Sequence, residues 1–233
     1  MASTRLPIEA LDYAKIYIKR MPLNQVFTQL ANRVSNIMWM AAPWRWTIGS
    51  TPTFTLTGAQ QNYTINYPAD WLYPIRSTVT DGKLTEPNLE IVPLIETVTG
   101  FVGSPKQIAF TGTAGQVGGP VQISPVPATV TGTLVVTGLY KKKITPYTNQ
   151  TIYNTVVPFP DEWFWVFEDG MLWAAYQYGD DRRAGDATID PSSGKLSYSG
   201  QRAQFEAGLE QMRQREPMIS LDPLIVNPKD VRK

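Results

Sequence analysis

The chain has 233 residues, of which 42% are hydrophobic, so it can bury a sizeable core as one large domain or two small ones. Its 21 basic and 20 acidic residues leave a formal net charge of +1, which provides no strong overall attraction to nucleic acid. It contains neither cysteine nor histidine. This composition excludes disulfides, thiolate metal sites and any enzyme mechanism that uses histidine as a general base.

Residue patterns typical of catalytic sites are also absent. The sequence has no G-x-S-x-G nucleophile motif, no G-x-x-x-x-G-K-[ST] phosphate loop, and no D-x-D or E-x-x-E pair. No stretch approaches the roughly 18 apolar residues that a membrane span needs. We therefore expect a soluble protein that is not an enzyme, has no catalytic or metal site and takes no cofactor.

Residues 1–46 are predicted to form N-terminal helices, one over 8–21 and a second over 22–42. Apolar residues recur along one face of the second helix at helical spacing, and Pro22 suits its first turn. Trp44 and Trp46 follow, flanking Arg45 at the spacing of an extended chain. We expect these two tryptophans to cover the end of a helical core, although they are also candidates for a stacking surface.

Residues 47–150 change in character to Thr, Val, Ile and Tyr interrupted by Gly and Pro, which is typical of short strands joined by turns. Asp81-Gly82 is a tight-turn signal, and the glycine-rich stretch Gly112–Gly119 predicts a mobile or tightly turning loop. The strand spacing predicts an antiparallel β-sandwich or barrel inserted between helical parts. The expected strands lie at 53–58, 62–67, 72–80, 89–95, 106–112, 121–126 and 131–142.

Lys141, Lys142 and Lys143 form the one compact basic run, at the end of the last expected strand. One interpretation is a solvated strand end that resists edge-to-edge pairing. The other is a surface that faces nucleic acid.

Residues 151–216 are predicted to be helical and to pack on the N-terminal helices as a bundle. Pro160 precedes Asp161, a predicted N-cap, and an aromatic helix that frays at Gly179. Because this helix is apolar over more than one stripe, it should be central to a core or shared with another chain. Its candidate subunit-contact or core residues are Trp163, Trp165, Trp173 and Tyr176. A polar connection and a last helix, stopped by Pro217, complete the α+β fold.

Residues 217–233 are predicted to form an extended C-terminal tail, because their prolines forbid a continuous helix. The tail is too apolar for a solvated end, so it should contact another protein surface or fold back along its own subunit. Its candidate partner-binding residues are Met218, Ile219, Leu221, Leu224, Ile225 and Val226.

The order of these segments resembles that of the adaptor, or head-to-tail connector, proteins of tailed bacteriophages. The helix and aromatic cluster LANRVSNIMWMAAPWRW precede Tyr63 to Trp71, which is similar to the family stretch Y-x-[LI]-P-x-D-[FW]. SPKQIAFTG, GPVQISPVPA and TLVVTGLYKKKITPYT follow where the family has its later strands. Gly170 and Ala175-Tyr176 match the family's aromatic helix, and the similarity covers about residues 25 to 216.

The resemblance implies a structural virion protein that forms the adaptor ring of the phage neck, commonly as a dodecameric ring. Such a ring binds the portal, joins it to a tail tube, nozzle or tail fibre protein, and lines the channel used in DNA ejection. Genomic DNA would pass through without specific binding. The apolar tail would then be a portal latch, the lysine run would lie near the channel, and assembly would occur in the host cytoplasm.

A different class of function is also open. A β-sandwich that binds carbohydrate, or a virion fibre module, would need several exposed rings on one face. The candidate rings are Trp44, Trp46, Trp71 and Tyr147. Their exposure distinguishes this alternative from the adaptor ring.

Overall fold

The computed structural model of the protein describes residues 3–17, 24–80, 85–95, 102–128, 134–192, 194 and 196–216. The chain divides into two compact units, with boundaries between Trp44 and Arg45 and between Lys143 and Ile144. We call the unit formed by the described residues before Arg45 and after Lys143 the helical unit, and the other one the β unit. The α+β composition predicted from the sequence is confirmed.

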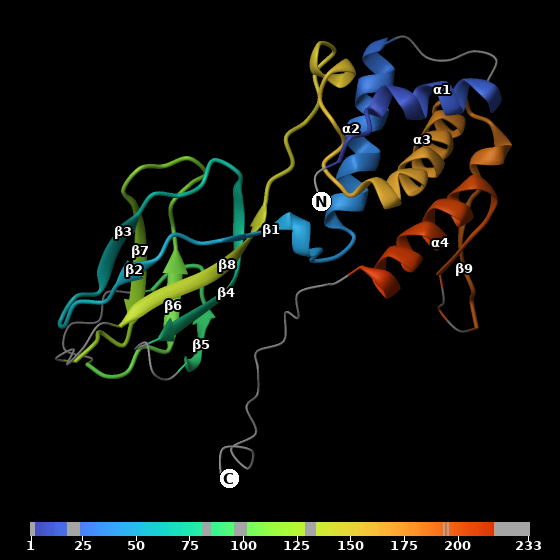
Figure 1. Ribbon diagram of the computed structural model, residues 1–233. Coiled ribbons are helices and arrows are strands. Elements are labelled where there is room, and N and C mark those ends of the chain that lie inside the picture. Colours follow the sequence, from blue (N-terminus) through green and yellow to red (C-terminus); the bar gives the residue numbers. More distant parts are fainter. Residues whose placement is uncertain are drawn as a thin grey trace. The chain divides into compact units, whose positions relative to one another are not determined.

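Four α-helices dominate the helical unit among the described residues: α1 (Pro7–Tyr17), α2 (Asn24–Met40), α3 (Phe164–Tyr178) and α4 (Gly200–Arg215). Helix α3 packs against each of the other three and lies among them in Figure 1. Short 3-10 turns occur at η2 (Thr151–Tyr153), η3 (Asp161–Trp163) and η4 (Arg182–Ala184). Helices that precede and follow the β unit in the sequence therefore share one hydrophobic core.

Gly170 sets how closely the neighbouring helices approach α3. A Cβ at this position would lie 2.5 Å from Cγ1 of Val34 on α2 and 2.8 Å from Cε2 of Phe205 on α4. The rings of Phe205 and Trp173 stack beside it, with centroids 5.7 Å apart. Glycine is required here because both helices occupy the space that a side chain would fill.

The β unit begins with η1 (Arg45–Thr47) and contains one eight-stranded sheet, in the order β1-β8-β4-β5-β6-β7-β3 with β2 also pairing β8. The sheet is curled, and apolar side chains from most of its strands form one core. The bounds are β1 (Ile48–Ser50), β2 (Phe54–Thr55), β3 (Asn62–Ile65), β4 (Trp71–Thr80), β5 (Thr85–Ile91), β6 (Gln107–Phe110), β7 (Gly119–Ser124) and β8 (Val135–Lys142).

The expectation of an antiparallel sheet is wrong at one pair of strands. β5 and β6 are parallel, with Glu90 opposite Gln107 and Ile91 opposite Ile108, so the sheet is mixed. The physical reason is the connection over residues 92–106, which is too long for a hairpin and lets the chain return in the same direction.

Several local expectations differ from the structure. Arg45 lies in a 3-10 turn, not in an extended chain. The polar connection expected before the last helix lies at the surface, but it also contains an unexpected two-stranded sheet of β9 (Ala187–Ile189) and β10 (Leu196–Tyr198). The expected Asp81-Gly82 turn and the tail at 217–233 lie outside the described residues. None of the described helices has the length and apolar character needed to cross a bilayer.

Candidate interaction surfaces

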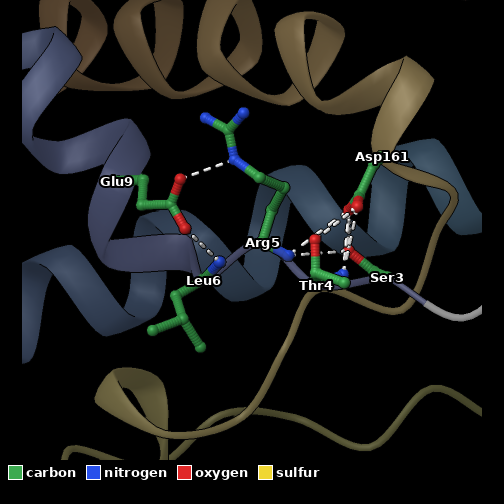
Figure 2. Close-up of polar contacts among 6 residues, drawn as sticks. All are labelled: Ser3, Thr4, Arg5, Leu6, Glu9 and Asp161. Atoms are coloured by element: carbon green, nitrogen blue, oxygen red, sulfur yellow. Dashed lines mark hydrogen bonds and ion pairs between the residues drawn. The ribbon is translucent and has the colours of Figure 1, made fainter.

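The carboxylate of Asp161 holds the N-terminal arm, residues 3–6, against the start of α3. Figure 2 shows the hydroxyls of Ser3 and Thr4 converging on it, and the Thr4 hydroxyl donates to Oδ2 at 2.6 Å. The backbone N–H groups of Thr4 and Arg5 donate to Oδ1 at 3.0 and 3.3 Å. The Ser3 and Thr4 hydrogen bonds, which favour the ionised form, lower the pKa of Asp161 to about 2. The predicted role as N-cap of its own helix is wrong, because α3 begins after Trp163.

Arg5 and Glu9 complete this contact, which we call the N-terminal clamp. The Glu9 carboxylate accepts from the backbone N–H of Leu6 at 2.8 Å, which caps α1, and also pairs with Nε of Arg5 at 2.5 Å (Figure 2). The Arg5 guanidinium lies over the ring of Phe164, 4.2 Å from its centroid. The clamp therefore ties the beginning of the chain to α3, and its role is structural.

Three of the four aromatic candidates are core residues of their own subunit. Trp163, Trp173 and Tyr176 are only 3–5% exposed. Nε1 of Trp163 donates to Oε2 of Glu216 at 2.8 Å, at the point where α4 ends. Most apolar side chains of α3 are thus buried by other parts of the same chain. The helix as a whole therefore does not need a second chain to cover it. Trp165 differs, since 38% of it is exposed.

The lysine run is not a uniformly solvated strand end. Lys141 is only 2% exposed, and its Nζ donates to Oγ1 of Thr47 at 2.7 Å. Burial lowers the pKa of Lys141 to about 8. The physical reason is sheet order: β8 lies between β1 and β4, so its end is not a sheet edge. Lys142 is half-buried and Lys143 is exposed, so these two are the lysines of the run that reach solvent.

Tyr67, in the stretch that resembles the family motif, orders the loop from Gly112 to Gly119. Its hydroxyl donates to the carbonyl of Pro120 at 2.8 Å and accepts from the N–H of Gly112 at 3.2 Å. A Cβ at Gly112 would lie 2.2 Å from the Tyr67 ring. The loop is therefore tightly turning, and it carries Val117 with 82% of its surface exposed.

Asp70 and Trp71, from the same stretch, brace the end of β8. The Tyr140 hydroxyl donates to Asp70 at 2.6 Å, and the carbonyl of Asp70 accepts from the N–H of Lys143 at 2.6 Å. The rings of Trp71 and Tyr140 stack with centroids 4.9 Å apart. The motif residues thus build the β unit, and Trp71 is buried in it.

The four rings proposed for a carbohydrate platform do not form one. Trp44, Trp71 and Tyr147 are at most 6% exposed. Nε1 of Trp44 donates to the carbonyl of Met38 at 2.7 Å, which closes the end of α2 as expected. Trp46 alone among the four is half-buried. A sugar could not stack on rings that are covered by protein.

Sequence reasoning missed the hairpin of β9 and β10, which carries exposed apolar side chains. Ile189 lies directly opposite Leu196, and 67% and 47% of these residues are exposed. The alternation in Ala-Thr-Ile and Leu-Ser-Tyr around Asp-Pro-Ser-Ser-Gly was a usable hairpin signal.

Two other expectations concern the tail and metal binding. The six tail candidates, Met218 to Val226, lie outside the described residues. In the described part of the chain, no group of three or more acidic residues could hold a metal ion.

Comparison with known protein families identifies a family that matches most of the chain. The model of the SU10 adaptor protein family matches residues 11–226, which include nearly all of the helical unit, the whole β unit and part of the C-terminal tail. No curated protein matches the chain. The family match confirms the resemblance derived from the sequence motifs.

Proposed function

Since this chain belongs to the SU10 adaptor protein family, we propose that it forms the adaptor ring of a tailed-phage neck and joins the portal to the tail. The observation that carries the proposal is the extent of the match, which spans both units of the structure and not one isolated domain. The proposed location is the neck of the virion, after assembly in the host cytoplasm. The role is structural and uses no cofactor.

The proposed partners are other copies of the chain, in a ring of twelve, together with the portal and a tail tube, nozzle or tail fibre protein. A ring requires heterologous contacts, in which two different surfaces of each copy meet. The helical unit is proposed to face the portal, and the β unit the tail. The segment from Met218 to Val226 is proposed as the portal latch, because its apolar side chains need a surface to offset the cost of ordering them.

The proposed ring also lines the channel through which the genome passes. DNA in transit must slide, so the wall should carry few tight phosphate contacts. With Lys141 buried, Lys142 and Lys143 are the lysines of the run that a channel wall could present. The total charge of +1 agrees with a conduit that does not bind DNA specifically.

The proposal is tested by mixing the purified full chain with purified rings of the portal protein from the same phage, then examining the product by negative-stain electron microscopy. We expect a second ring stacked on the portal. A chain that stays monomeric and leaves the portal bare would overturn the proposed function. A soluble, monomeric protein of similar mass and net charge, added in the same amount, controls for non-specific adsorption to the portal.

A further inference from the structure

Two arginine side chains, Arg33 on α2 and Arg202 on α4, lie over one buried ring of the helical unit. The guanidinium carbon of Arg33 is 4.9 Å from the ring centroid of Trp173, and that of Arg202 is 5.3 Å from it. Trp173, on α3, is only 3% exposed, and its ring stacks on that of Phe205. Three helices therefore hold both guanidinium groups beside one fixed aromatic ring. We call Arg33 and Arg202 the arginine pair.

The positive charge of the arginine pair has little compensation within the described part of the chain. Helix α2 contains no acidic residue, and the exposed Arg33 forms no ion pair with any described residue. Nε of Arg202 lies 3.9 Å from Oε1 of Glu206, which is too far for a hydrogen bond. This Nε is buried and has no hydrogen-bond partner among the described residues. Two like charges held beside one ring therefore favour an anion from another source.

A carboxylate is the anion that fits this pair best. A guanidinium group that stacks on an aromatic ring keeps its N–H edges free, and these edges bind a carboxylate through two parallel hydrogen bonds. Nucleic acid is disfavoured, because the segment that contains α3 is acidic: between Lys143 and Arg182 the chain has six acidic residues and no basic one. Such a segment repels a polyanion, whereas a single carboxylate needs only the local contact.

The same acidic segment supplies an exposed carboxylate for this contact. Glu162 lies just before α3, and it forms no hydrogen bond or ion pair with a described residue. Asp180 and Asp186 are exposed as well, but two arginines lie between them in the sequence. From Phe164 to Trp173, α3 rises by about 14 Å, so Glu162 and the arginine pair are separate surfaces of one copy. A second copy can therefore present Glu162 to the arginine pair.

We propose that the arginine pair of one copy binds the carboxylate of Glu162 in the next copy around the ring. The inference rests on the proposed ring and names a polar contact between its neighbouring copies. Because the two surfaces are different, the contact is heterologous and can repeat from copy to copy until the ring closes. The opposite charges also set the direction of the contact, since two surfaces of like charge repel each other.

The first test reverses the two charges separately and together in the full chain. Arg33→Glu and Glu162→Arg each place like charges together, so each should raise the concentration for half-maximal ring assembly on the portal at least about fivefold. The double variant restores opposite charges and should recover most of the lost assembly. Arg182→Glu is the matched control, because Arg182 is another exposed arginine of the helical unit, and its reversal should leave assembly unchanged.

The outcomes of this test separate the contact from the proposed function. Circular dichroism should show that every variant remains folded; Arg33→Gln, which removes the charge without adding repulsion, replaces Arg33→Glu if the reversal unfolds the chain. Unchanged assembly of the Arg33 variant, or losses that the double variant does not recover, would overturn the contact while the rings of the unsubstituted chain retain the proposed function. Failure of that chain to form rings would overturn both.

The second test uses salt and duplex DNA. An ion pair at an interface is screened by salt, so raising the NaCl concentration from about 0.05 to about 0.5 M should weaken assembly of the unsubstituted chain more than that of Arg33→Gln/Glu162→Gln. An equal salt dependence of the two proteins would contradict the ion pair. Anisotropy titrations with a labelled duplex give the other check: DNA that binds the unsubstituted chain but not Arg33→Gln would assign the arginine pair to phosphate and overturn the inference.

Discussion

Lys141 should make the stability of the β unit depend on pH. Its ammonium group is buried beside Thr47, and burial lowers its pKa from 10.5 to about 8. A lysine whose pKa is depressed in the folded state destabilises the fold at low pH, because the unfolded chain binds the proton more tightly. Stability should therefore rise as the pH increases from about 8 towards 10.5, where the unfolded state still holds the proton and the folded state has lost it.

The size of the effect follows from the two pKa values. Between about pH 7 and pH 9, the difference in proton binding should add about 1 kcal/mol to the free energy of unfolding. Lys141→Met removes the titrating group, so that variant should lack the increment, while Lys143→Met, at the exposed end of the run, should keep it. Other lysines and tyrosines titrate in all three proteins, so their contributions cancel in the comparison.

The assay is urea unfolding at both pH values, followed by tryptophan fluorescence and fitted to obtain the free energy of unfolding. The reasoning predicts a larger increase with pH for the unsubstituted chain and Lys143→Met than for Lys141→Met. If all three changed in parallel, the Lys141 ammonium would not be desolvated in the fold, and the account of its burial would be refuted.

We expect four further outcomes, two from contacts within the helical unit and two from the proposed role in the phage neck. Gly170→Val should lower the free energy of unfolding, measured by thermal melts, by about 1 to 3 kcal/mol through overpacking against α2 and α4. Gly103→Val provides the comparison, because a Cβ there would make only an ordinary contact, 3.6 Å from Cβ of Pro125. Asp161→Ala should release the N-terminal arm and speed amide hydrogen exchange at Thr4 and Arg5; unchanged exchange would contradict the clamp. Deletion of residues 217–233 should leave the melting temperature unchanged but weaken portal binding; equal binding would make the tail a passive end. Duplex DNA should bind negligibly to the isolated chain at physiological salt in anisotropy titrations, and tight sequence-selective binding would contradict a conduit.

The long elements could be predicted from sequence because their signals are local. α2 and α3 keep helical apolar spacing over 17 and 15 residues, and β4 and β8 are extended β-rich runs between turn residues. β1 was missed because three residues are too few for an alternating pattern to be recognised. The hairpin of β9 and β10 was missed although its alternation and its turn residues are visible in the sequence.

The environments of individual side chains depended on contacts far away in the chain. Asp161 looked like a helix cap, but its hydrogen-bond partners lie more than 150 residues earlier. Lys141 looked solvated, but strand order places β8 between two neighbours, and Thr47 meets its ammonium across 94 residues. The number of large rings on α3 suggested contact with another subunit, but α1, α2 and α4 cover most of them. No local pattern encodes these long-range contacts.

The mass of the complex between the purified full chain and a portal ring tests the central claim most directly. Mass photometry should show the portal peak shifted by about 310 kDa, the mass of twelve chains of 26.0 kDa, with no populated species at intermediate mass once the chain is in excess. Such a shift is the result expected of a closed adaptor ring. A portal peak that does not move at any concentration of the chain would contradict the assignment of this protein to the neck.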